Sequence, residues 1–136
     1  MKKIPLKDVL IRIQIACKDL LLDRYADELD MAVKYDEEKF KESLKAIQAL
    51  SNELRLLVLV ITSLREFPVC ILSSMLKKDQ TLLSHHLKIL KEAGLLKESV
   101  EGRFRFYQLN KEKIDEIIQF LEKLKDPENW WTKEAE

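Results

Sequence analysis

The sequence predicts a mostly helical protein that carries one small β-hairpin. Apolar residues recur at intervals of three and four along most of the chain, which is the spacing of amphipathic helices. Residues 79–96 are typical of a capped helix that ends at a glycine, and a short basic hairpin follows at about residues 97–109. A polar-faced helix followed by such a hairpin outlines a winged helix-turn-helix, whose partner is double-stranded DNA.

Residues 6–33 are expected to form a long, mostly helical stretch. Its apolar stripe comprises Leu6, Val9, Leu10, Ile13, Ala16, Cys17, Leu20 and Leu21. Ile11, Ile15 and Leu22 lie off this stripe, so the helix would be apolar on more than one side. A helix buried on two sides in so small a protein suggests a subunit interface.

Three shorter helices should follow before the hairpin. The first covers residues 36–50, and the second runs from a Ser51 cap to about Glu66. Pro68 then breaks the chain, and a helix from Val69 to about Lys77 follows.

The next helix should read the DNA, and the hairpin should form the wing. Asp79 is a plausible N-cap, Leu83, Leu87 and Leu90 face inward, and Gly94 supplies the left-handed stop. Residues 97–100 and 103–109 are predicted strands around Glu101-Gly102. The last helix covers residues 111–124 and ends at Asp126-Pro127.

One domain is the economical interpretation of a 136-residue chain without an internal repeat or a low-complexity linker. We expect a helical extension for dimerisation at 1–35, the winged helix-turn-helix core at 36–125, and a tail at 126–136. No apolar run approaches the roughly 20 residues that span a bilayer, and no signal peptide is evident. The two cysteines form no disulfide framework. These features favour a cytoplasmic protein with reduced thiols and no membrane partner.

The charge is segregated along a chain whose formal net charge is zero. Residues 77–113 hold nine Lys/Arg and five Asp/Glu, a net +4, so the remainder carries −4. Residues 19–42 hold nine acids and four bases. The basic share therefore falls on the segment with the DNA-reading shape.

The candidate DNA contacts follow from the outward positions of the reading helix, the turn before it and the wing. They are Lys77, Lys78, Gln80, Thr81, Ser84, His85, Lys88, Arg103 and Arg105. Gln can bond adenine with two hydrogen bonds, Ser and Thr suit bases or phosphates, and Lys favours guanine or phosphate. Lys77 and Lys78 would clamp the backbone, and the wing arginines would reach the adjacent minor groove or its phosphates.

A run of residues in this chain resembles the ArsR-type winged-helix repressors. It comprises Ala49-Leu50-Ser51, Arg55-Leu56 and Leu59, then Leu72, Leu76, Gln80 and Ser84-His85-His86-Leu87-Lys88-Ile89-Leu90-Lys91-Glu92-Ala93-Gly94-Leu95, then Glu101-Gly102-Arg103 and Tyr107-Gln108-Leu109-Asn110. The resemblance covers about residues 37–124 and implies a homodimeric transcriptional regulator, with the first and last helices pairing the subunits. The expected interface residues are Leu10, Ile13, Cys17, Leu20, Leu21, Ile114, Ile117, Ile118 and Leu121.

The chain departs from the metal sites of that family. Where the arsenic-type site has Cys-Val-Cys and a third Cys, this chain has Pro68-Val69-Cys70 and Ser73. Where a second type of site has Asp and His, then His or Glu, this chain has Lys111 and Lys113, then Leu124 and Pro127. One thiol and two charged lysines make poor ligand sets, so we expect no metal and no cofactor at either place.

Other reactive residues have simpler interpretations. His85 and His86 point about 100° apart on a helix, so His85 should face DNA and His86 should pack inward. Cys17 and Cys70 are expected to be two buried thiols, with a redox pair as the alternative. Trp130 and Trp131 should pack on a neighbouring helix, with a ligand site as the alternative. No catalytic arrangement is present, so an enzyme is not expected.

The favoured hypothesis is a homodimeric regulator, most simply a repressor, whose two reading helices lie about 34 Å apart on an inverted repeat. The alternative is a winged-helix protein-interaction module that does not bind DNA. A protein that binds DNA regardless of sequence is disfavoured. Such binding depends on neutralisation of phosphates by a basic protein, and the net charge of this chain is zero. A small-molecule or redox effector stays open, and the sequence does not identify one.

Overall fold

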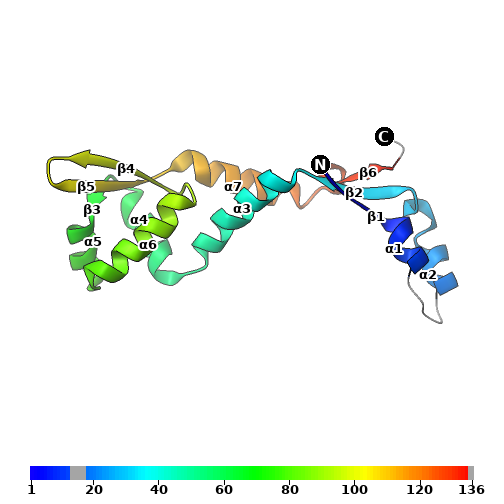
Figure 1. Ribbon diagram of the computed structural model, residues 1–136, viewed down its shortest axis with the longest axis horizontal. Helices are drawn as coiled ribbons and strands as arrows, with labels where there is room; N and C mark the ends of the chain where they lie inside the picture. Colours follow the sequence, from blue (N-terminus) through cyan, green and yellow to red (C-terminus); the bar gives the residue numbers. More distant parts are fainter. Residues whose placement is uncertain (13–17, 135–136) are drawn as a thin grey trace. The chain divides into compact units, whose positions relative to one another are not determined.

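A computed structural model describes residues 1–12 and 18–134 of the chain (Figure 1). The residues group into two compact units, Met1–Phe40 with Leu121–Glu136, and Lys41–Phe120. The elements, in chain order, are β1 (Lys2–Pro5), α1 (Leu6–Arg12), α2 (Lys18–Arg24), the 3-10 helix η1 (Ala26–Glu28), β2 (Met31–Tyr35), α3 (Glu37–Leu50), α4 (Glu53–Thr62), β3 (Phe67–Pro68), α5 (Val69–Leu76), α6 (Gln80–Glu92), β4 (Leu96–Glu101), β5 (Phe104–Leu109), α7 (Lys111–Lys123), the 3-10 helix η2 (Pro127–Asn129) and β6 (Trp131–Lys133).

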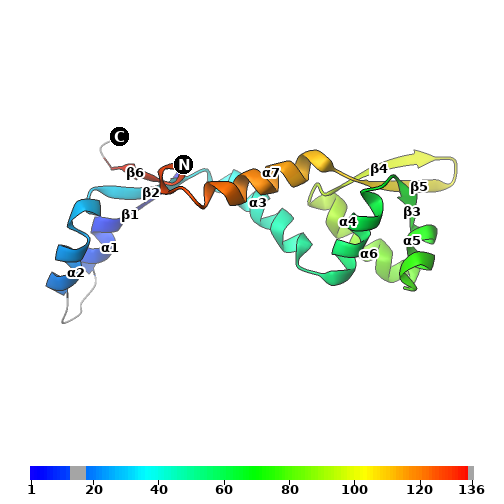
Figure 2. The ribbon, with the colours of Figure 1, turned by 180° about the vertical axis from the view of Figure 1, so that it is seen from behind.

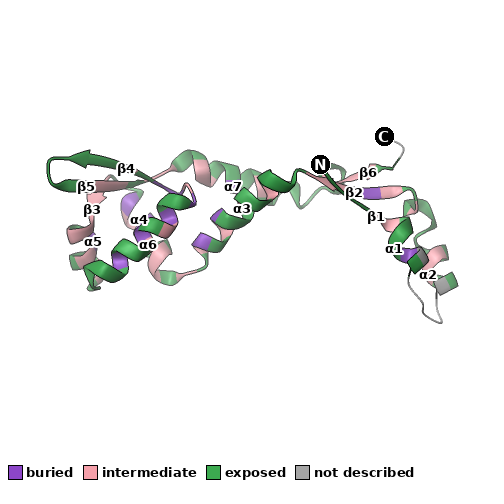
Figure 3. Ribbon diagram, in the orientation of Figure 1, coloured by how far each residue is buried: buried purple, intermediate pink, exposed green. Residues whose placement is uncertain are grey.

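The Lys41–Phe120 unit has one hydrophobic core built on α4, α5 and α6. Leu83, Leu87 and Leu90 of α6 are all buried, as their spacing predicts. They pack with Val58 of α4 and Leu72 of α5 in one cluster that also takes residues from α3 and α7. Figure 3 shows the buried segments of α3, α4 and α6 in purple between exposed segments in green. This packing holds α6 in place and leaves its other side to solvent.

The helix ends depart from the predicted ones at α4. Asn52, and not Ser51, is the N-cap, because its Oδ1 accepts a hydrogen bond of 3.0 Å from the Arg55 amide. The helix stops at Thr62 rather than near Glu66, and the next residue, Ser63, is its C-cap. The Thr62 hydroxyl donates back to the Val58 carbonyl at 2.8 Å, which satisfies a polar group that is fully buried.

The wing is a three-stranded antiparallel sheet of order β3-β5-β4 (Figure 2). Glu101 pairs with Phe104, so the two-residue turn is Gly102-Arg103 and not the predicted Glu101-Gly102. Gly102 has φ +60° and Arg103 has no positive φ, which is the pattern of a type II′ turn. Strand β3 was not predicted, because a strand of two residues is too short to show the alternation of apolar and polar residues by which strands are recognised. The hairpin and the helices before it confirm the predicted winged helix-turn-helix.

The unit formed by Met1–Phe40 and Leu121–Glu136 is built differently from the predicted long helix. The prediction of helix over 6–33 is wrong at residues 31–33, which belong to β2 (Met31–Tyr35), the central strand of a sheet of order β1-β2-β6. β6 comes from the tail, so the sheet is completed by residues about 100 positions away in the sequence. Local periodicity cannot reveal such a pairing. Ala32 is fully buried in this unit.

The tail belongs to this same unit through Trp130. Its ring lies edge-on to Phe40 of α3, with centroids 6.1 Å apart, and its Nε1 donates to the Lys123 carbonyl at 2.8 Å. The predicted packing against a helix is therefore confirmed for Trp130, whereas Trp131 begins β6. No helix in residues 1–12 and 18–134 is both long and apolar enough to cross a bilayer.

Candidate nucleic-acid interface

The turn between α5 and α6 presents two lysines. Lys77 adopts the left-handed conformation, with φ 53° and ψ 46°, and its amide donates to the Ser73 carbonyl. The Lys78 amide donates to that same carbonyl at 3.2 Å, and the Ser73 hydroxyl donates to the Lys78 carbonyl. Both lysine side chains are exposed. A fixed backbone therefore holds two positive charges at the entrance to α6.

The exposed face of α6 is polar. Gln80, Thr81, Ser84, His85 and Lys88 are all exposed, opposite the three buried leucines. Asp79 occupies the N-cap position as predicted, yet its carboxylate accepts no capping hydrogen bond. The first-turn amides of α6 therefore lack a side-chain acceptor, and such amides favour an anion. This face has the hydrogen-bonding groups that base edges and phosphates require.

Arg55 of α4 contacts α6 through His86. The sequence alone did not predict this contact. Its Nε donates to the Ala49 carbonyl at 2.7 Å, and its Nη1 lies 3.2 Å from His86 Nδ1. Because a guanidinium can only donate, His86 must accept at Nδ1 and keep its proton on Nε2. His86 is partly buried and packs inward as predicted, and it links α6 to α4. The neighbouring His85 ring is exposed, with its centroid 5.7 Å from that of His86.

Acid should weaken this link. Burial lowers the pKa of His86, and the charges of Arg55 and His85 lower it further. A histidine whose pKa is lower in the folded chain stabilises the fold above its unfolded pKa of about 6.5, and that stability is lost as the pH falls through the folded pKa. Urea unfolding of the native chain should therefore show lower stability at pH 5.5 than at pH 7.5. The His86→Gln variant should lose less over this interval, and an equal loss in both proteins would contradict the assignment.

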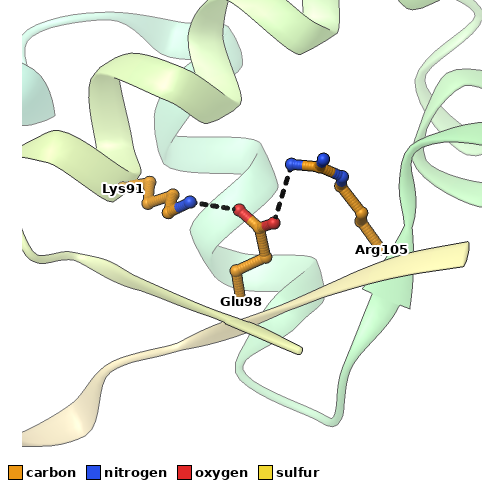
Figure 4. A network of polar contacts seen from close by, with 3 residues as sticks. All are labelled: Lys91, Glu98 and Arg105. Atoms are coloured by element: carbon orange, nitrogen blue, oxygen red, sulfur yellow. Dashed lines mark hydrogen bonds and ion pairs between the residues drawn. The ribbon is translucent and has the colours of Figure 1, made fainter. Parts of the chain in front are cut away.

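The wing contributes two arginines with different surroundings. Arg103 stands in the hairpin turn and is exposed. Arg105 lies on β5 and forms an ion pair with Glu98 of β4 at 3.1 Å, and Glu98 also pairs with Lys91 of α6 at 2.6 Å. Figure 4 shows the Glu98 carboxylate between these two cations. The network therefore ties the wing to the end of α6 and engages the Arg105 side chain within the protein.

The two cationic partners of Glu98 keep its carboxylate charged. Its side chain is only 10% exposed, whereas those of Lys91 and Arg105 are 50% and 67% exposed. The hydrogen bond and charge of Lys91, together with the charge of Arg105, lower the pKa of Glu98. Glu98 therefore stays ionised at neutral pH.

The two units carry opposite net charge. Lys41–Phe120 holds 13 Lys/Arg and 10 Asp/Glu, a net +3, and the remainder of the chain holds 11 and 14, a net −3. The positive balance lies on the unit that contains α6 and the wing. Attraction to a polyanion is thus a property of this unit rather than of the whole chain.

Within the described part of the chain, the expected subunit-interface residues fall into three groups. Leu10 and Ile117 are buried within the single chain, at 6% and 5% exposure. Leu21 and Ile114 are partly buried, and Leu20, Ile118 and Leu121 are exposed. Ile13 and Cys17 lie outside the described residues. Exposed leucine and isoleucine on α2 and α7 are surface that a second subunit could cover.

The described residues offer little for metal or thiol chemistry. Cys70 of α5 is a free, partly buried thiol, and the other member of the suggested pair, Cys17, is outside the described part of the chain. Within residues 1–12 and 18–134, no group of three His, Cys, Asp or Glu side chains is arranged to hold a metal ion.

Comparison with known proteins gives consistent matches. The family model described as a bacterial regulatory protein of the arsR family matches residues 52–98, which include α4 to α6. An uncharacterised HTH-type transcriptional regulator of Methanocaldococcus jannaschii is 34% identical over 64% of this chain and 99% of its own length. An arsenical resistance operon repressor of Staphylococcus aureus is 35% identical over 60% of this chain and 79% of its own length.

A solved structure shows the same fold. It is the homodimeric winged helix-turn-helix DNA-binding domain of a possible regulator from Mycobacterium bovis. This chain matches it with a TM-score of 0.55 and 22% identity, over 69% of this chain and 90% of that one. The matches thus agree with the wing and helices seen here.

Proposed function

The chain belongs to the ArsR family of bacterial regulatory proteins, and we propose that it acts as a homodimeric repressor that reads an inverted repeat in DNA. The observation that carries this proposal is the polar face of α6. Five exposed side chains with base-reading groups stand opposite three buried leucines, beside two exposed lysines of the preceding turn. Side chains of this kind have no part in the core, and they match what the major groove requires.

In the proposed complex the contacts divide into two classes. Gln80, Thr81, Ser84, His85 and Lys88 face base edges or nearby phosphates, while Lys77, Lys78 and Arg103 contact the phosphate backbone. Base contacts set sequence preference, and phosphate contacts set affinity for any DNA. The two classes can therefore be separated by experiment.

The first test is fluorescence anisotropy with duplexes from the protein's own promoter and a scrambled control. Gln80→Ala should reduce the preference for the promoter, because a well-placed base contact contributes about 1–3 kcal/mol of discrimination. Lys77→Ala should weaken binding to both duplexes equally and reduce the salt slope by about 1. No binding of the native chain at low salt would overturn the proposal and favour a protein-interaction module.

The two wing arginines should differ in their importance. Arg105 is already paired with Glu98, so moving it to a phosphate breaks an existing interaction. Arg103, in the turn, has no ion pair with Glu98 to break before it can contact a phosphate. Arg103→Ala should therefore reduce DNA affinity about fivefold or more, and Arg105→Ala should reduce it less. The two titrations at equal salt check this order, and a larger effect at Arg105 would contradict it.

Dimerisation through α2 and α7 is the second part of the proposal. The homodimeric Mycobacterium bovis domain supports it, and so do exposed Leu20, Ile118 and Leu121. The repressor role rests on likeness to the Staphylococcus aureus repressor. A reporter gene behind the bound promoter decides this point, because a repressor lowers its expression.

A further inference from the structure

The unit formed by Met1–Phe40 and Leu121–Glu136 has a cavity of about 520 Å³ that opens to solvent. Its described lining residues come from α1, the loop and 3-10 helix around η1, β2 and the tail. They are Leu6, Tyr25, Glu28, Met31, Pro127 and Trp131. Cavities of about 300–1,000 Å³ hold drug-sized molecules. The cavity is large enough for a small organic ligand.

The walls of the cavity are mostly apolar. Leu6, Met31 and Pro127 offer apolar surface, and Tyr25 and Trp131 add two aromatic rings. Glu28 is the one lining residue among the six that carries a charge at neutral pH. The described ion pairs include no cation beside its carboxylate.

We propose that this cavity binds a hydrophobic organic cation, such as an amine, quaternary ammonium or phosphonium compound with an aromatic or branched apolar body. The apolar walls take the body of the ligand. The faces of Trp131 and Tyr25 attract the cation, and the Glu28 carboxylate balances its charge. An anion of equal size would meet the same walls and be repelled by Glu28, in a unit with net charge −3.

This site goes beyond the proposed DNA binding and can be tested without DNA. The probe is tetraphenylphosphonium, titrated into the full chain by isothermal titration calorimetry in sodium buffer. We expect one saturable site with a dissociation constant on the order of tens of micromolar. The matched probe is tetraphenylborate, which has nearly the same size and shape and the opposite charge. It should bind at least about tenfold more weakly.

Variants locate the site. Glu28→Gln should weaken tetraphenylphosphonium binding about fivefold, and Trp131→Leu about threefold. Asp27→Asn is the control, because it removes the same charge from the neighbouring exposed residue, which does not line the cavity. It should leave affinity unchanged, and circular dichroism checks that every variant folds.

Three results would overturn the proposal. They are no saturable binding of tetraphenylphosphonium up to millimolar concentration, equal or tighter binding of tetraphenylborate, and equal losses in Glu28→Gln and Asp27→Asn. The second result would indicate an apolar site without charge preference. The third would indicate only a general attraction of cations to an acidic unit.

Discussion

Ser84→Glu should reduce affinity for the promoter duplex by about 100-fold or more while leaving the fold intact. Ser84 is exposed at the centre of the polar face of α6, between Thr81 and Lys88. In the proposed complex the serine hydroxyl can donate a hydrogen bond to DNA. A glutamate at this position removes that donor and places a negative charge beside the phosphates, which repel it. Like charges brought together at an interface cost several kcal/mol, and the lost contact adds to this.

The control for this variant is Ser51→Glu. Ser51 is also an exposed serine in the same unit, and it lies in the connection between α3 and α4. Both variants add one negative charge to the unit, so a purely long-range effect of net charge would reduce affinity equally in both. Anisotropy at two salt concentrations makes the comparison. Equal affinity of Ser84→Glu and the native chain would show that α6 is not the helix that meets DNA.

The fold of the Lys41–Phe120 unit could be predicted because its signals are local. Leu83, Leu87 and Leu90 mark the inward side of α6 by spacing alone, and the structure buries all three. Gly94 has φ +79°, the left-handed conformation expected of a helix stop. The nine predicted DNA contacts are all exposed, as contacts with an external partner must be, and their roles stay predictions.

The other unit could not be predicted, because its order depends on distant pairing. Met31–Tyr35 contains Met, Ala and Lys beside Val and Tyr, and this mixture suits a helix as well as a strand. It becomes a strand through pairing with Lys2–Pro5 on one side and Trp131–Lys133 on the other. Register between segments this far apart leaves no trace in a single sequence.

The polar supports of the candidate interface were missed for a related reason. Arg55 and His86 are 31 positions apart, and Glu98 meets Lys91 and Arg105 from different elements. A sequence shows that these residues are charged or polar, but not which of them converge. Arg105 is an example. The alternation of side chains along the strand predicts that Arg105 faces outward, but it does not predict the ion pair with Glu98.

Leu87→Ala should lower the free energy of unfolding by about 3 kcal/mol, as expected for a leucine truncated in a closely packed core. Leu87 is 1% exposed and lies in the core cluster with residues of α4 and α5. Truncation removes buried methyl groups and leaves a cavity that the surrounding helices close only in part. Because small domains have total stabilities of about 5–15 kcal/mol, the loss is a large fraction of the whole.

Leu82→Ala provides the matched comparison on the same helix. Leu82 precedes the buried Leu83 and is 43% exposed, so the same truncation should cost well below about 1.5 kcal/mol. The free energy of unfolding is measured in urea for the native chain, Leu87→Ala and Leu82→Ala. Repeating the measurement at several protein concentrations separates the folding of the chain from dissociation of a dimer. If Leu82→Ala were as destabilising as Leu87→Ala, the Leu82 side chain would be covered in solution rather than exposed.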